Sequence, residues 1–482
     1  MITFFLSITV LLAGYIFYSR FLDKVMKVDA GRPTPSITLN DGIDYVPMPL
    51  WRVYLIQFLN IAGLGPIFGA IAGAMWGPVA FLWIIFGTVF AGGVHDYFSG
   101  MLSVRHEGKS INEIIGIYLG KYAKQIMTLF TIILLILVGV VFISGPAGLL
   151  AGLTPTTLDY TFWVWVIFIY YILATLLPID KIIGKIYPIF GFALIFMAIS
   201  LITALLVKGY QIPELNAENF RNFHYDKERF PIFPMLFITI ACGAISGFHA
   251  TQSPLMARCL KNEKEGRKVF YGAMVTEGVV ALIWAAIGMS FFGSVDKLNE
   301  VMIAQNGNAA WVVNEVSDTL LGTFGAVLAI LGVVAAPITS GDTAFRSARL
   351  TIADLVKTPQ KLIRNRLIII IPLFAVGFLL TRINFDVIWR YFAWANQTLA
   401  TVVLWTITVY LVNTKSRFYF ITLIPSIFMT AVVTSYIMLA PEGFSLPKPL
   451  SYGIGLFCTA AAFLLFLVHM NKRKKSAEKN HE

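Results

Sequence analysis

Thirteen apolar runs, each long enough to cross the hydrocarbon core of a bilayer as a helix, recur along the 482-residue chain. Hydrophobic residues make up 57% of the sequence, and charged residues make up 13%, about half the usual share of a soluble domain. A soluble core cannot hide this much apolar surface, so the sequence predicts an all-α integral membrane protein with about 13 transmembrane helices. The expected spans are approximately 2–18, 51–75, 78–104, 125–150, 162–180, 186–206, 232–258, 268–293, 320–345, 367–381, 387–412, 418–439 and 450–470.

The distribution of Lys and Arg predicts how the chain is oriented, because cytoplasmic loops carry the positive excess. If the basic C-terminal tail is cytoplasmic, 29 of the 37 Lys and Arg residues (37 minus 8) fall on the cytoplasmic side. The eight in outer loops are Lys208, Arg221, Lys227, Arg229, Lys297, Arg382, Arg390 and Lys448. We therefore expect a multi-pass protein of the cytoplasmic membrane with its N-terminus outside. The first run lacks a basic n-region and a cleavage site, so we expect it to remain as a helix.

The net charge of +11 is explained by this topology and by affinity for the anionic lipids of the bilayer, so no nucleic-acid partner is expected. Cys242, Cys259 and Cys458 form neither a CxxC pair nor a spacing typical of a metal site. We expect no cofactor. The sequence indicates no particular oligomeric state.

The second run, 51–75, contains a helix-breaking stretch between Gly63 and Pro66. Proline lacks the amide hydrogen and its ring clashes with the preceding turn, so a continuous helix is not expected here. Gly65, Gly69 and Gly73 also form a stripe of small residues that would let another helix approach closely. This run alone leaves a functional break and simple close packing equally open.

The seventh run, 232–258, carries a polar and glycine-rich stretch from Gly243 to Pro254. Interrupted segments at corresponding positions of two halves indicate a transporter site near the bilayer midplane. The two interruptions are five segments apart, which predicts two inverted five-helix repeats. We expect an N-terminal peripheral helix and cytoplasmic loop (1–50), a first repeat (51–206), a second, inverted repeat (232–412), and two peripheral helices with a basic tail (413–482).

Several short motifs follow one another between about residues 44 and 400. They are DYVP at 44–47, AGLGPI at 62–67, FAGGVHD at 90–96, SGFHA at 246–250, YGAM at 271–274 with Glu277, SGDTAFRSAR at 340–349, and Asn396-Gln397 with Leu399-Ala400. On these motifs the chain resembles the carbon starvation CstA family of peptide and pyruvate transporters. The family is usually placed in the amino acid, polyamine and organocation superfamily, which implies an inverted 5+5 core with two broken helices. Longer family members continue well past 482 residues, so the resemblance leaves the substrate preference open.

Charged side chains inside a membrane span cost about 2.5–3.5 kcal/mol each on insertion scales, so each one needs a reason. Asp342 precedes Arg346 by four residues, and a structural ion pair is as well supported as a role in ion coupling. For Asp96, a structural pair with Arg349 or another cytoplasmic base is slightly favoured. The candidates without a local partner, and the better ones for handling a proton, are Glu277 and His249. A neutral histidine bonded to a backbone carbonyl is the alternative for His249.

The ninth run places Thr339 and Ser340 three and four positions after Ala336. In sodium-coupled relatives of the superfold that the resemblance implies, this pattern supplies oxygens to sodium, together with carbonyls of the first broken helix. A sodium site is thus predicted at Ala62, Gly65, Ala336, Thr339 and Ser340. The coupling ion is H⁺ or Na⁺.

No Lys or Arg lies near the expected midplane site, so backbone amides at a half-helix N-terminus would hold a substrate carboxylate. This favours a small carboxylate such as pyruvate, or a di- or tripeptide, imported by ion-coupled alternating access. The predicted substrate-binding residues are Gly63, Gly65, Pro66, Gly69, Ser246, Gly247, His249, Thr251 and Gln252.

Two other function classes fit less well. An intramembrane enzyme is disfavoured because the sequence around Ser246 is not a G-x-S-x-G elbow and no HExxH motif is present. A passive channel is less favoured than a carrier, because the interruptions occur as a pair in inverted halves.

Overall fold

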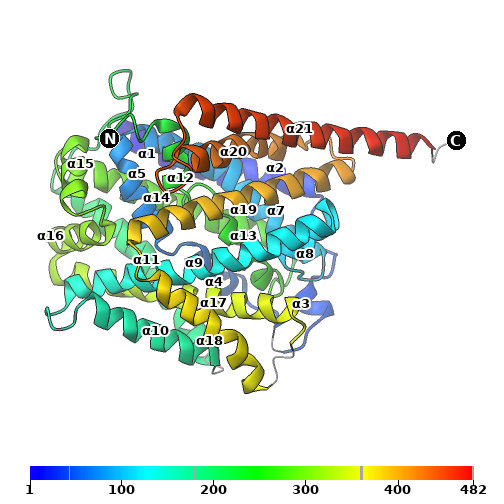
Figure 1. Cartoon of the computed structure of the whole chain (residues 1–482), viewed down its shortest axis with the longest axis horizontal. Helices are drawn as coiled ribbons and strands as arrows, with labels where there is room; N and C mark the ends of the chain where they lie inside the picture. The colour runs from blue at the N-terminus through cyan, green and yellow to red at the C-terminus, as the bar shows by residue number, and fades with distance from the viewer. Residues whose placement is uncertain (43, 177–179, 359–361, 480–482) are drawn as a thin grey trace.

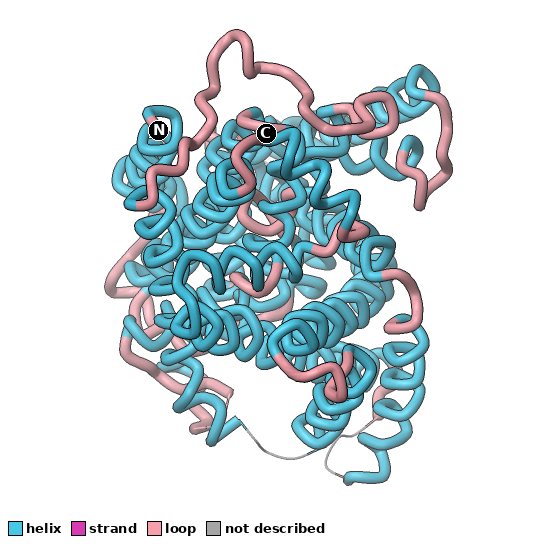
Figure 2. The backbone as a smooth tube through the Cα atoms, turned by 90° about the vertical axis from the view of Figure 1, so that its left-hand side faces the viewer, coloured by secondary structure: helices cyan, strands magenta, loops and turns pink. Residues whose placement is uncertain are grey.

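The computed structural model describes residues 1–42, 44–176, 180–358 and 362–479, with the backbone alone at 175–176, 180–188, 339, 354 and 474–479. Within these ranges the chain forms helices, turns and loops without any strand. The predicted all-α class is confirmed. In Figure 1 the long helices α9 (Lys121–Leu153), α19 (Phe385–Asn413) and α21 (Lys448–Lys479) cross the molecule roughly parallel to one another. Figure 2, turned by 90°, shows helices filling the interior and the longer loops at the periphery.

Ten helical stretches in the described part of the chain are long and apolar enough to span a bilayer. Besides α9, α19 and α21, they contain α1 (Ile2–Ala13) with α2 (Ser19–Met26), α6 (Val79–Phe86) with α7 (Gly93–Arg105), α11 (Asp180–Val207), α14 (Gly272–Phe291), α16 (Ala309–Ala329) with α17 (Ala336–Leu355), α18 (Ile363–Leu380) and α20 (Phe420–Leu439). The other helices are shorter: α3 (Pro35–Thr38), α4 (Leu50–Ile61), α5 (Ala70–Gly73), α8 (Ile111–Leu119), α10 (Tyr160–Leu176), α12 (Phe237–Thr239), α13 (Gly247–Ala257) and α15 (Val295–Ala304).

The predicted count of thirteen spans is not confirmed. The described residues provide ten spans, or up to eleven if the bent pair Leu50–Ile61 and Gly65–Trp76 is counted as one. The run predicted at 162–180 forms an apolar helix, Tyr160–Ala174, that is shorter than these spans. The run predicted at 232–258 is divided between α12 and α13, and neither piece can cross a bilayer by itself.

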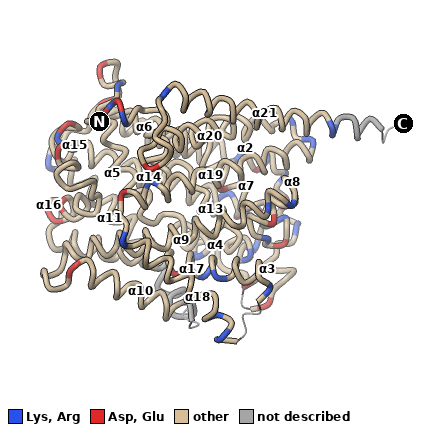
Figure 3. Tube along the Cα trace, viewed as in Figure 1, with Lys and Arg blue, Asp and Glu red and all other residues tan. Residues whose placement is uncertain are grey.

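The termini and the basic residues are unevenly placed around the bundle. The N-terminus lies at one end of the helix bundle, and α21 extends beyond the other end (Figure 1). Lys and Arg gather at the end that carries α3 and α8, on the side toward which α21 extends (Figure 3). Which end faces the cytoplasm stays a prediction.

Both interruptions predicted from the sequence are present. The helix axis bends by 54° between α4 and the segment that begins at Gly65. Residues 240–246 between α12 and α13 are not helical, and Gly243 there has a φ of +89°, a backbone angle that favours glycine. Helix α14 packs against α4 and α5, and its side chains are buried on almost every face, as expected of an apolar core helix. These two breaks and α14 position the site described next.

Candidate functional site

The non-helical stretch 240–246 leaves backbone carbonyls without helical partners, and side chains from neighbouring helices bind them. Trp83 Nε1 donates to Ile240 O at 2.9 Å, and Thr88 Oγ1 donates to Gly243 O at 2.7 Å. Gln397 Nε2 on α19 donates to Phe237 O. An unpaired buried carbonyl costs free energy, so these contacts explain how the break persists inside an apolar interior.

The first turn of α13, on the far side of the break, is capped by α19. Asn396 Oδ1 accepts hydrogen bonds from the backbone N–H of Phe248 at 2.9 Å and from Ser246 Oγ at 3.0 Å. A side-chain oxygen at this position satisfies amides that a helix start leaves free. In this conformation Asn396 therefore makes the hydrogen bonds that we predicted for a substrate carboxylate at Ser246 and Gly247. Binding of substrate there stays a prediction.

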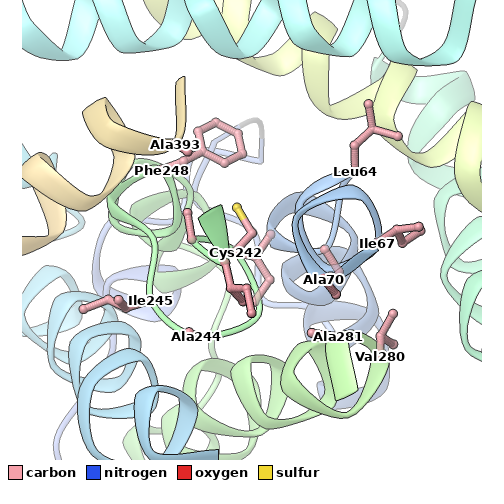
Figure 4. Packing of buried hydrophobic residues seen from close by; sticks show 14 of the residues in the cluster. Leu64, Ile67, Ala70, Cys242, Ala244, Ile245, Phe248, Val280, Ala281 and Ala393 are labelled. Carbon is pink, nitrogen blue, oxygen red and sulfur yellow. The ribbon is translucent and has the colours of Figure 1, made fainter. Parts of the chain in front are cut away.

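The two breaks pack against each other, and Cys242 of the second break lies beside the turn that carries Ile67 and Ala70 (Figure 4). A Cβ atom added to Gly65 would lie 2.1 Å from Cys242 Cβ, and one added to Gly69 would lie 3.0 Å from Thr239 O. Gly73 packs in the same way on Ile240. The small-residue stripe thus serves close packing and accompanies a bend of the helix, and a functional role for the break stays a prediction.

Four ionisable side chains form one continuous chain of contacts beside the second break. His95 Nδ1 lies 2.7 Å from Asp96 Oδ1, and His249 Nδ1 lies 2.8 Å from Asp96 Oδ2. The other ring nitrogen of His249, Nε2, lies 3.4 Å from Glu277 Oε2. All four side chains are fully buried. The cluster joins three helices, α7, α13 and α14, and we call these four residues the His–carboxylate cluster.

The outer ends of this cluster are not satisfied within the described residues. His95 Nε2 and both carboxylate oxygens of Glu277 are buried without a hydrogen-bond partner. Cys242 Sγ, His249 Nε2 and the Glu277 carboxylate lie within 4.8 Å of one another and are donor types found in metal sites. His249 also lies between two carboxylates, an arrangement that suits an imidazole that binds and releases protons. The proton-handling role predicted for Glu277 and His249 stays a prediction.

The structure confirms some predicted contacts and corrects others. Asp342 and Arg346 form the predicted ion pair, with Arg346 Nη2 at 3.2 Å from Asp342 Oδ2. The expected pairing of Asp96 with Arg349 is wrong, because two histidines occupy the Asp96 carboxylate. The backbone-carbonyl alternative for His249 is also wrong, since its two nitrogens face carboxylates.

The residues predicted to bind sodium are only partly described. Ser340 Oγ donates to Leu59 O at 3.1 Å and to Ala336 O at 3.3 Å, so α17 contacts the last turn of α4, just before the first break. The side chain of Thr339 lies outside the described residues. A sodium site at Ala62, Gly65, Ala336, Thr339 and Ser340 stays a prediction.

The other predicted substrate residues lie close to the breaks, and all but the partly exposed Thr251 are buried. A Cβ atom on Gly63 would meet the Phe142 ring at 2.5 Å, and Pro66 lies against Gly243. Gln252 Nε2 donates to Thr251 Oγ1 at 2.9 Å. Thr251 lines a cavity of about 710 Å³ on the predicted cytoplasmic side, together with Ser347 and other polar residues. A cavity of about 560 Å³ on the predicted outer side reaches Ala72 and Thr239, and the two cavities share no lining residue.

Sequence reasoning noted His95 next to Asp96 inside a span without assigning it a role, and it missed the positions of Cys242, Asn396 and Gln397 at the site. The adjacent polar pair Asn396-Gln397 inside an apolar run was the available signal. His95 is adjacent to Asp96, yet only the folded chain brings His249 to the same carboxylate.

A second charged cluster lies on the predicted cytoplasmic side. The buried carboxylate of Glu263 accepts hydrogen bonds from Arg105 Nε and Arg32 Nη1, both at 2.9 Å, and from the backbone N–H of Asp29. Thr34 Oγ1 donates to Leu260 O at 2.6 Å. These bonds fasten the N-terminal cytoplasmic loop to the end of α7 and to the loop that follows α13.

We expect Glu263→Gln to destabilise the protein by about 3–5 kcal/mol, since removing one partner of a buried ion pair leaves the other charges uncompensated. Thermal unfolding in detergent measures this. Glu265→Gln, two residues away and outside the cluster, is the matched control and should change the unfolding temperature little. Equal unfolding temperatures for both variants would show that the cluster does not stabilise this face.

Comparisons with known proteins extend these observations. The profile of the family described as Carbon starvation protein CstA matches residues 1–155, 151–322 and 306–436. An uncharacterized membrane protein of Haemophilus influenzae is 43% identical over 352 residues, which is 63% of this chain and 95% of that protein. The peptide transporter CstA of Helicobacter pylori (strain 26695) is 31% identical over 332 residues, 56% of this chain and 48% of that protein.

The pyruvate/proton symporter BtsT of Escherichia coli is 28% identical over 337 residues, 58% of this chain and 47% of that protein. The chain thus matches about half the length of these two named transporters. Among solved structures, a mutant of the manganese transporter of Eremococcus coleocola superposes with a TM-score of 0.51 at 12% identity, covering 88% of this chain and 95% of that one. At this identity the likeness concerns the fold alone.

Proposed function

Because the chain belongs to the carbon starvation protein CstA family, we propose that it is a secondary active transporter that imports a small carboxylate or a short peptide across the cytoplasmic membrane. Relatives named as a peptide transporter and as a pyruvate/proton symporter support this proposal. The paired breaks and the two separate cavities fit alternating access, in which each cavity in turn would reach the substrate site.

The observation that carries the coupling mechanism is the position of His249 between Asp96 and Glu277. A protonated imidazole donates from Nδ1 to Asp96 and places Nε2 at 3.4 Å from the Glu277 carboxylate, and the three groups then carry two negative charges and one positive charge. A net charge buried in an apolar interior is costly, so one further proton is favoured. Glu277 would accept it, because its two carboxylate oxygens are buried without a geometrically good hydrogen bond among the described residues. We infer that the His–carboxylate cluster binds one exchangeable proton.

The substrate would bind beside this cluster, between Gly65 of the first break and the Asn396 cap of the second. Movement of α13 away from α19 would release the Phe248 amide from Asn396 and free it for a carboxylate. Protonation of Glu277 would alter the hydrogen bonds of His249 on the same half-helix. This shared element is how proton binding and substrate binding would be coupled.

The test is uptake by the purified protein in proteoliposomes. We expect labelled pyruvate or a labelled di- or tripeptide to accumulate under an imposed proton gradient, and a sodium gradient alone should not drive accumulation. Counterflow of labelled substrate distinguishes a carrier from an enzyme and from a channel, because only a carrier exchanges substrate through a closed cycle. Accumulation driven by sodium alone would instead favour the site at Ala336 and Ser340.

A further inference from the structure

The cavity on the predicted outer side has a size and lining typical of a small-molecule site. Its volume of about 560 Å³ lies within the range of about 300–1,000 Å³ common for such sites. Aromatic rings form much of its wall: Trp76, Tyr225, Phe230, Trp389 and Tyr436. Such rings can bind apolar side chains, and their faces also attract ammonium groups.

Only two formally charged residues, Asp386 and Arg390, line this cavity among the described residues. They lie four residues apart on α19, so they project from the same face of the helix on successive turns. They do not pair with each other within 4.0 Å. The cavity therefore presents one negative and one positive group as separate binding points.

Each of these groups has unused hydrogen-bonding capacity. The carboxylate of Asp386 lies over Gly307, where an added Cβ atom would be 2.3 Å from it, and it accepts no hydrogen bond from a described residue. Arg390 Nε lies 3.3 Å from the buried Glu442 carboxylate. The two terminal Nη groups of Arg390 make no hydrogen bond or ion pair within the described part of the chain. They can therefore bind a carboxylate bidentately.

His224, in the loop 208–231, also lines the cavity but adds no charge near neutral pH. Burial against aromatic rings lowers the pKa of His224 to about 4. Its Nδ1 accepts a hydrogen bond from the backbone N–H of Asp226 at 3.2 Å, which fixes the ring as a neutral acceptor.

We propose that this outer cavity is a recognition site for small zwitterions, above all short peptides, in which Asp386 binds the ammonium end and Arg390 binds the carboxylate end. A 2-oxo acid such as pyruvate offers only a carboxylate, so it would use Arg390 alone while facing the Asp386 charge. This inference rests on the proposed transport function. It favours peptides over 2-oxo acids as the substrate class. Trp389, between the two charged residues, would contact the peptide's middle.

The test pairs each residue with the ligand group that it should recognise. Binding of dialanine, N-acetyl-dialanine, dialanine amide and pyruvate to the full chain in nanodiscs is measured by calorimetry. Asp386→Asn should weaken dialanine at least about tenfold and leave N-acetyl-dialanine unchanged, since that ligand has no ammonium. Arg390→Gln should weaken dialanine similarly and leave the amide unchanged. Asp296→Asn and Arg382→Gln, charges outside this cavity, are the matched controls.

Arg390→Gln also removes the partner of Glu442, so Arg390→Lys serves as a second variant. It keeps the charge beside Glu442 but loses the bidentate geometry, and it should still weaken dialanine. Equal binding of dialanine and N-acetyl-dialanine by the unmodified chain, or tighter binding of pyruvate than of dialanine, would overturn the proposal. Uptake in proteoliposomes separates the zwitterion-site hypothesis from the transport hypothesis. If pyruvate accumulates but dialanine does not bind, only the zwitterion site is ruled out. If the expected binding pattern is found but no substrate is taken up, only the transport function is ruled out.

Discussion

Glu277→Gln should reduce concentrative uptake to the level of protein-free liposomes while exchange of labelled for unlabelled substrate continues. The amide keeps the size of the side chain but cannot bind and release a proton, and exchange needs no net proton movement. His249 lies 3.4 Å from the Glu277 carboxylate, so His249→Gln should have the same effect. Uptake under an imposed proton gradient and counterflow, measured on the same proteoliposomes, report the two activities.

Glu300→Gln is the control for this experiment, because Glu300 is exposed on α15 and far in sequence from the cluster. It should accumulate substrate normally. Unchanged accumulation by both Glu277→Gln and His249→Gln would remove the His–carboxylate cluster from the coupling mechanism. If Glu277→Gln loses both exchange and accumulation, Glu277 belongs to the substrate site.

Gly247→Val should abolish accumulation and exchange together and lower the unfolding temperature by a few degrees. A Cβ atom on Gly247 would lie 2.4 Å from Asn396 O and 2.6 Å from Ala400 N, both backbone atoms of α19. Backbone cannot rotate away as a side chain can, so α13 would be pushed off α19. Overpacking of this kind costs about 1–3 kcal/mol.

The matched control is Gly453→Val on α21, where no heavy atom lies within 4 Å of an added Cβ. Thermal unfolding in detergent and counterflow in proteoliposomes should both match the unmodified chain. Normal transport by Gly247→Val would show that α13 and α19 are not in this close contact in the membrane.

Local sequence features predicted local structure well. Pro66 lacks the amide that a helix requires, and the glycine-rich stretch around Gly243 permits the positive φ found there, so the sequence alone places both breaks. The pair Asp342–Arg346 follows from the four-residue repeat of a helix face. Each of these inferences depends on residues within one or two turns of each other.

The proton site could not be assembled in this way. Asp96 and His249 are 153 positions apart, and nothing in either run specifies that α7 packs against α13. From sequence alone, Asp96 was therefore expected to pair with a nearby arginine, and no carboxylate partner was assigned to His249. For the same reason the cap that Asn396 provides to Phe248, 148 positions away, was not predicted. The number of spans stays unconfirmed, because apolar length alone cannot show where a run is divided into shorter pieces.

The hydrogen bonds from α19 to both sides of the second break limit how the molecule can move. Gln397 forms a hydrogen bond with α12, and Asn396 accepts one from the start of α13. Two adjacent residues of α19 therefore hold the two half-helices. The first break meets the second where Gly65 faces the Cys242 side chain and Gly73 faces the Ile240 side chain. Tilting α13 away from α19 would break the bond from Phe248 to Asn396, whereas α12 would stay bonded to α19 through Gln397. We therefore expect opening of the site to separate α13 from a unit formed by α12 and α19.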